Sequence, residues 1–97
     1  MNRNRFLILV PVNGRQVQVR GHRYTVLVKG AAARRSSPGW LAQLAVTDAE
    51  GSVPVTLDLS AEKILAFDVN GIADHVIEAL TEWLDLPENE RSEVLTL

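Results

Sequence analysis

The stretch NGIADHVIEALTEWLDL, residues 70–86, decides the fold. Its apolar residues recur every three or four positions, the spacing that places them on one side of an α-helix. They are Ile72, Val76, Leu80 and Trp83, widened by Ala73, Ile77 and Leu84. The opposite side carries Asp74, Glu78, Glu82 and Asp85. We therefore expect an amphipathic helix over residues 72–86 that lies on a hydrophobic core.

Local signals bound this helix and suggest a shorter one before it. Asn70-Gly71 predicts a turn ahead of the helix, and Pro87 biases the preceding residue away from helical geometry, so the helix should end at residue 86. Ser60 can cap a short helix that begins at Ala61. The apolar side of that short helix would be made of Ile64, Leu65 and Phe67.

The first sixty residues are rich in β-branched and apolar residues and predict five strands, over residues 5–12, 15–20, 23–29, 40–47 and 52–59. The first is apolar enough to be buried on both faces, and Pro11 places it at a sheet edge or near its own end. The second predicted strand alternates polar and apolar residues, so the face with Gln16 and Gln18 should be exposed to solvent. Short loops between the first three strands require antiparallel pairing.

Turn residues separate these strands. Asn13-Gly14 is the strongest signal, because both residues tolerate the positive φ of a type I′ hairpin, and Gly21-His22 predicts the next turn. Residues 48–51 predict a hairpin loop with glycine where positive φ is usually needed. Pro54 lacks an N–H, so the fifth strand lies at an edge or its N–H side faces water.

Residues 30–39, GAAARRSSPG, have no apolar periodicity. We expect them to form a mobile loop, which is either functional or a tolerated insertion. Residues 87–97 form a polar tail until Val94, and its end is either a short strand or a last helical turn.

These elements predict one small α+β domain over residues 1–97. Its antiparallel sheet would have about five strands, built from hairpins and a meander, with the long C-terminal helix packed on one face. A chain of 97 residues can bury one modest core. The hydrophobic fraction of 46% and the charged fraction of 23% are ordinary for a globular protein, so we expect an ordered chain.

The chain has no cysteine, which excludes disulfides and thiolate chemistry and fits a reducing compartment. The N-terminal apolar run covers only residues 6–12, and no small-residue cleavage site directly follows it. No apolar segment approaches the roughly 18 residues that a membrane helix needs. We expect a cytoplasmic protein with no membrane partner.

Charge is distributed unevenly along the chain. Residues 1–35 contain eight bases and no acid, whereas residues 36–97 contain all twelve acids and only Lys63 and Arg91 as bases. The formal charge is therefore +8 in the first part and −10 in the second, although the whole chain carries −2. Either the basic part forms a surface for nucleic acid or an acidic partner, or the two parts lie side by side and neutralise each other.

Residues for catalysis are scarce. His22 and His75 are the only histidines and occur in no metal-binding spacing. Ser36 and Ser37 lie in a basic loop without a nucleophile motif around them. No glycine-rich phosphate loop is present. We therefore expect no catalytic residue, no metal and no cofactor, and a protein that is not an enzyme.

Two surfaces remain as candidates for binding. The acidic face of the long helix, with Asp74, Glu78 and Glu82, could compete with nucleic acid for a basic cleft on another protein. The alternative is a nucleic-acid-binding module whose phosphate contacts come from bases in the first part of the chain. Those bases are Arg15, Arg20, Arg34 and Arg35. Tyr24 is the one aromatic of that region suited to stacking on a base, and no known nucleic-acid motif is present.

The order of predicted elements over residues 24–86 resembles HicB-like antitoxins. The segments GWLAQLAV, VPVTLDL and ILAF are similar to small bacterial immunity proteins of the WapI type. Neither resemblance includes the basic N-terminal hairpin, and no family is assigned from them. They imply a sheet-and-helix module that binds and neutralises a protein partner. We therefore favour a protein-binding module, as an inhibitor, antitoxin or immunity protein, that could form a homodimer through an unpaired sheet edge.

Overall fold

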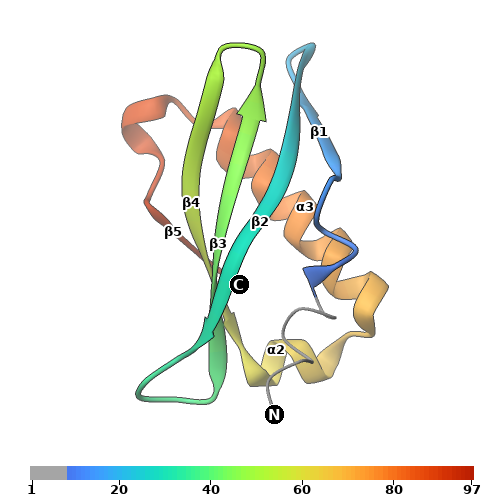
Figure 1. Ribbon diagram of the computed structural model, residues 1–97, viewed down its shortest axis with the longest axis vertical. Helices are drawn as coiled ribbons and strands as arrows, with labels where there is room; N and C mark the ends of the chain where they lie inside the picture. Colours follow the sequence, from blue (N-terminus) through green and yellow to red (C-terminus); the bar gives the residue numbers. More distant parts are fainter. Residues whose placement is uncertain (1–8) are drawn as a thin grey trace.

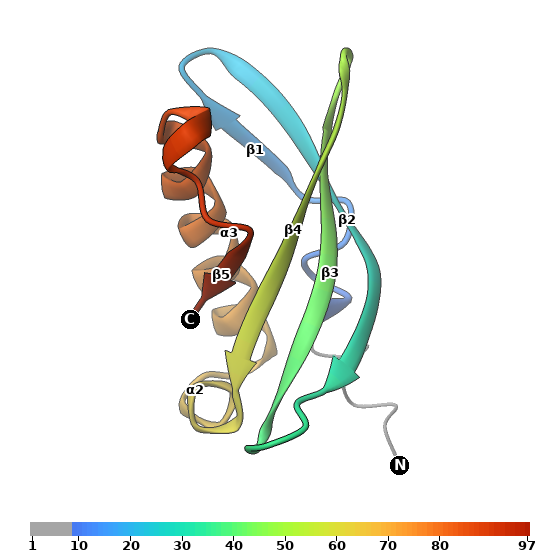
Figure 2. The same cartoon turned by 90° about the vertical axis from the view of Figure 1, so that its left-hand side faces the viewer.

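The computed structural model describes residues 9–97, apart from the side chain of Val69. A five-stranded sheet with the order β1-β2-β3-β4-β5 curls around one long helix, α3 (Figure 1 and Figure 2). The expected α+β class, with the C-terminal helix on one face of the sheet, is confirmed. The elements are β1 Gln16–Val19, β2 His22–Ala33, β3 Gly39–Asp48, β4 Gly51–Ser60, α2 Ala61–Ala66, α3 Val69–Asp85, η1 Glu88–Glu90 and β5 Val94–Thr96.

One hydrophobic core fills the space between the sheet and α3. Alternate residues of the strands point toward the helix, and the predicted apolar side of α3 faces them, so the expected orientation of α3 is confirmed. Burial of each large side chain contributes roughly 1.5–3 kcal/mol. The strands supply Val17, Val26, Ala42, Leu44, Val46, Val55, Leu57 and Leu59, and α3 supplies Ile72, Ala73, Val76, Leu80, Trp83 and Leu84.

Both helices begin at side-chain caps. Ser60 Oγ accepts a hydrogen bond from the Lys63 N–H at 3.1 Å, as the sequence predicted. The start of α3 was predicted wrongly, because Asp68 caps it and accepts from the Gly71 N–H at 2.7 Å. The supposed turn at residues 70–71 is therefore the first turn of the helix. The helix ends before Pro87, as expected.

The predicted first strand is wrong over residues 9–12, and residues 5–8 lie outside the described part of the chain. Residues 9–12 form a helical turn, in which the Val12 N–H donates to the Leu9 carbonyl at 2.9 Å. This turn places Leu9 and Val12, three positions apart, together in the core. A strand would have sent these two side chains to opposite faces, whereas Val10 between them is 61% exposed.

The type I′ geometry occurs at Arg20-Gly21 and not at Asn13-Gly14. Arg20 and Gly21 have φ of +53° and +78° and join the paired residues Val19 and His22. Asn13 instead uses its side-chain oxygen to accept from the Val28 N–H at 2.9 Å. The predicted turn at residues 21–22 was thus displaced by one residue.

The predicted loop over residues 30–39 is shorter than expected. Residues 30–33 continue β2 and pair with residues 40–43 of β3, after an irregularity between Val28 and Gly30. The connecting loop therefore spans only residues 34–38. The small side chains of residues 30–33 show no apolar periodicity. The strand β2 nevertheless extends through them, because the backbone of β3 supplies their hydrogen-bond partners.

The sheet has four antiparallel strands and one parallel strand. β5 pairs in parallel with residues 56–58 of β4, because α3 carries the chain back to the end of the sheet from which β4 began. Of the two alternatives for the end of the tail, the short strand is the one that occurs, as β5, and the 3₁₀ turn η1 before it was not predicted. Pro54 lies in the part of β4 that β5 does not reach, as the missing N–H predicted.

Candidate functional site

Three of the four basic residues predicted to bind a partner are engaged within the chain. Arg15 lies 3.4 Å from Asp74, and Arg20 donates to Asp85 at 2.9 Å. Both contacts join the β1–β2 hairpin to α3. Exposed pairs of this kind contribute only about 0–1 kcal/mol. Their main consequence here is that part of the basic first third lies against the acidic remainder of the chain.

The third of these residues, Arg34, anchors the loop of residues 34–38. Its Nε donates to Asp58 at 2.7 Å, and its Nη1 donates to Ser37 Oγ at 3.1 Å. The side chains of Arg34 and Asp58 are 19% and 24% exposed, so salt screens this pair less than the two on the hairpin. Arg34 is therefore a structural residue in this loop, whereas its neighbour Arg35 is exposed.

The predicted acidic stripe of α3 divides into two parts. Asp74 and Asp85 face the β1–β2 hairpin and its arginines. Glu78 and Glu82 are exposed, and neither takes part in an ion pair among residues 9–97. The structure thus brings Arg15 and Asp74 together, and leaves Arg35, Glu78 and Glu82 as separate exposed charges.

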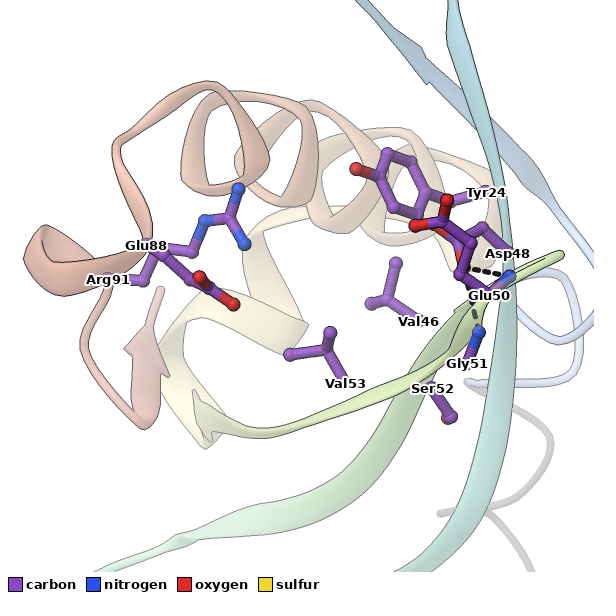
Figure 3. A pocket seen from close by; sticks show the side chains of 9 residues that line it. All are labelled: Tyr24, Val46, Asp48, Glu50, Gly51, Ser52, Val53, Glu88 and Arg91. Carbon is purple, nitrogen blue, oxygen red and sulfur yellow. Dashed lines mark hydrogen bonds between the residues drawn. The ribbon is translucent and has the colours of Figure 1, made fainter.

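A pocket of about 390 Å³ lies at the tips of the two hairpins (Figure 3). Tyr24, Asp48 and Glu50 border one side, and Glu88 and Arg91 border the other, across Val46 and Val53. Arg91 donates to the carbonyls of Leu84 at 2.8 Å and Leu86 at 3.1 Å, which close the end of α3. Its guanidinium also lies 5.4 Å from the Trp83 ring centroid.

Asp48 holds the two hairpin tips together. Its Oδ1 accepts from the N–H groups of Glu50 at 2.8 Å and Gly51 at 3.0 Å, which shapes the β3–β4 turn. Its Oδ2 lies 2.7 Å from Nε2 of His22, where the imidazole N–H donates because an ionised carboxylate only accepts. The side chains of Asp48 and Arg91 at this pocket therefore already serve the fold.

These hydrogen bonds predict a pH-dependent stability. The bond from His22, and then the one from the Glu50 N–H, lower the pKa of Asp48 below its ordinary value of 3.8. A carboxylate with a lowered folded-state pKa stabilises the fold above its unfolded-state value, and this contribution is lost as the pH falls through the folded-state pKa. Asp48→Asn should therefore lower the melting temperature at neutral pH, and the difference from wild type should shrink below pH 3.8.

Thermal melts followed by circular dichroism between neutral and strongly acidic pH measure this difference. Glu50→Gln, in the same turn, is the matched control, because the Glu50 side chain is exposed and only its backbone N–H bonds Asp48. It should show a smaller difference from wild type. An Asp48→Asn difference that stays constant down to the lowest pH would contradict the role assigned to this carboxylate.

A second concavity is a groove of about 520 Å³ between α3 and the C-terminal segment, which we call the α3–β5 groove. It is lined by Ala79, Glu82, Trp83, Leu86, Leu95 and Leu97, with Lys63 and His75 toward the α2 end and Glu90 on the rim. The residues of α3 that line it lie three or four apart, beside the buried stripe, so the helix overhangs β5 with one edge.

The position of the C-terminal segment is set by Trp83. The indole Nε1 donates to the Ser92 carbonyl at 2.8 Å, although the Trp83 side chain is almost fully buried. Thr56 and Leu97 then donate to the carbonyls of Glu93 and Asp58, each at 3.0 Å, and attach β5 to β4. The C-terminal segment, which forms one wall of the groove, is therefore bonded both to α3 through Trp83 and to β4.

Exposed apolar side chains occur in the groove and at its α2 end. Leu86, which lines the groove, is 43% exposed. At the α2 end, the Phe67 ring stacks on His75 at 5.3 Å between centroids and is still 40% exposed. Further along α2, Leu65 is 86% exposed. A concave apolar lining with exposed large apolar side chains is typical of interaction surfaces.

This groove was not predicted from the sequence. Residues 87–97 were interpreted as a tail that is polar until Val94, Trp83 as part of the apolar side of the helix, and Leu86 as the residue where the helix ends. The apolar residues Val94 and Leu95, at the end of an otherwise polar stretch, were the available signal. Their pairing partner could not be inferred, because β4 lies some forty residues earlier in the chain.

Within residues 9–97, no three side chains of His, Asp or Glu lie close enough together to hold a metal ion. In the same part of the chain, no helix has both the length and the apolar character needed to cross a bilayer.

The chain was compared with known proteins in three ways. It matches no family model, no curated protein sequence and no solved structure.

Proposed function

We propose that this chain is a non-enzymatic protein-binding module that holds a partner at the α3–β5 groove. The observation that carries the proposal is a groove lined by Leu86, Leu95 and Leu97 under an acidic rim, with the exposed Phe67 ring stacked on His75 at one end. Protein interfaces combine an apolar centre with a polar rim in this way. Inhibitors, antitoxins and immunity proteins are the functional classes that this proposal includes.

Charge indicates the kind of partner. Glu82 and Glu90 line the groove, and Lys63 is the one lysine or arginine of its lining. A partner surface with apolar residues surrounded by lysine or arginine complements this arrangement. The same acidic rim would repel the phosphates of a nucleic acid.

The nucleic-acid alternative has less support. Arg15, Arg20 and Arg34 already contact carboxylates within the chain, so a phosphate would have to displace them. Arg35 remains exposed for such a contact. A homodimer and a cytoplasmic location, which fits the absence of cysteine, belong to the proposal as further expectations.

Affinity capture from an extract of the native host, with and without nuclease, tests the proposed function. Leu86→Glu removes an apolar contact at the centre of the groove and puts there a carboxylate that would have to lose its water on binding, so it should abolish recovery of any discrete protein partner, a loss of at least about tenfold in affinity. Glu78→Arg is the matched control, because Glu78 is exposed on the outer side of α3 and does not line the groove. This variant should retain the partner.

Other outcomes would overturn the proposal. Recovery that nuclease abolishes, and that Arg35→Glu also abolishes, would establish the nucleic-acid alternative instead. Equal recovery by wild type and Leu86→Glu would exclude the groove as the binding surface. Light scattering of the purified chain measures the expected homodimer separately.

A further inference from the structure

The strand that borders the α3–β5 groove is the last strand of the sheet. β5 pairs with β4 on one side, and among residues 9–97 no strand pairs with its other side. An open strand edge offers backbone N–H and C=O groups to an incoming segment. Here the open edge runs beside the helix that overhangs it, as Figure 2 shows for β5 and α3.

Hydrogen bonds show which backbone groups this edge offers. The Glu93 carbonyl and the Leu97 N–H both bond to β4, and the register places Leu95 opposite Leu57 between them. Successive residues of a strand direct their backbone groups to alternate edges. The N–H groups of Val94 and Thr96 therefore point away from β4. The Val94 carbonyl already accepts from Ser92 Oγ at 2.6 Å, whereas no such bond engages the Thr96 carbonyl in the described residues.

We propose that the α3–β5 groove binds an extended segment of its partner, which adds to the sheet as a new strand beside β5. This inference rests on the protein-binding function proposed above and specifies how the partner is held. Backbone bonds to Val94 and Thr96 supply the attachment. Every second side chain of the added strand then points under α3, toward Trp83 and Leu86, because side chains alternate between the two faces.

The chemistry of the edge defines the segment that fits. Apolar residues at alternate positions would contact Leu95 and the α3 side of the groove, and basic residues between or beside them would face Glu82 and Glu90. A second copy of this chain is a poor occupant, because pairing β5 with β5 would bring the acidic residues of both copies together. The partner segment is therefore an extended, basic, alternately apolar peptide from a different protein.

Selection from a display library of random peptides, about twelve residues long, tests this inference on the purified chain. We expect the selected peptides to carry apolar residues at every second position with lysine or arginine among them. Apolar residues at intervals of three and four would overturn strand addition in favour of a bound helix. Strand addition in the groove would also be overturned if every selected peptide bound the Leu86→Glu variant as well as it binds the wild-type chain.

A backbone substitution separates strand addition from other contacts in the groove. Thr96→Pro removes an N–H that points away from β4, so the pairing of β5 with β4 remains. The selected peptide should bind this variant at least about tenfold more weakly, as expected for a lost hydrogen bond and a disturbed strand edge. Thr96→Val keeps the N–H and should bind within about twofold of wild type.

Amide hydrogen exchange of the wild-type chain gives a second measurement that needs no variant. The selected peptide should slow exchange at Val94 and Thr96, while Leu97, whose N–H already donates to Asp58, changes little. Unchanged exchange at Val94 and Thr96 would overturn strand addition. If groove-dependent binding persists in that case, the proposed protein-binding function stands. Loss of all groove-dependent binding, to peptide and to captured protein, would remove both proposals.

Discussion

Leu80→Asp is expected to leave the chain unfolded at room temperature. The Leu80 side chain is fully buried at the centre of α3, in contact with the core between helix and sheet. Truncation of a buried leucine to alanine alone costs about 2–5 kcal/mol, and an ionised carboxylate in the same place adds a desolvation cost. These costs approach or exceed the roughly 5–15 kcal/mol by which small domains are stable. Far-ultraviolet circular dichroism and urea titration measure the loss.

The matched control replaces a leucine in the neighbouring helix. Leu65 on α2 is 86% exposed, so Leu65→Asp should change the free energy of unfolding by no more than about 0.5 kcal/mol. A Leu80→Asp protein that remained folded, melted cooperatively and matched this control would refute the orientation of α3 on the sheet.

The sequence predicted α3 well because several local signals agree there. The apolar residues share one side of the helix and Pro87 ends it, although its start at the Asp68 cap was missed. Apolar residues at intervals of three and four indicate a helix whatever the rest of the chain does. The paired strands β3 and β4 were predictable for the same reason, since alternation and a glycine-containing turn are local features.

Predictions failed where the structure depends on distant partners. An unbroken apolar run cannot distinguish a strand from a helical turn, and in residues 9–12 the burial of Leu9 and Val12 favours the turn. Residues 30–33 are a strand only because β3 lies beside them. Likewise, the sequence could not show that only two acids of the α3 stripe, Asp74 and Asp85, form ion pairs, because their partners Arg15 and Arg20 lie in a distant hairpin.

Gly39→Ala is the second substitution expected to have a large effect. Gly39 begins β3 with φ of +148°, a conformation that residues with a side chain rarely adopt. This backbone strain alone costs on the order of 1–3 kcal/mol. A Cβ atom would also collide with the Leu59 carbonyl oxygen and lie 2.9 Å from Cδ and Nε of Arg34. The collision should therefore disturb the Arg34–Asp58 pair as well as the β3–β4 pairing.

Urea denaturation of Gly39→Ala and Gly30→Ala separates this local requirement from a general effect of adding a methyl group. Gly30 lies in the neighbouring strand β2, its φ is not in the positive range, and a Cβ there would meet no atom within 4 Å. Gly30→Ala should therefore be neutral or stabilising by up to about 1 kcal/mol, because alanine restricts the unfolded chain. Equal losses in the two variants would contradict the close approach assigned to Gly39. A large loss at Gly39 alone would show that the loop of residues 34–38 requires glycine at the start of β3, where Arg34 crosses to Asp58.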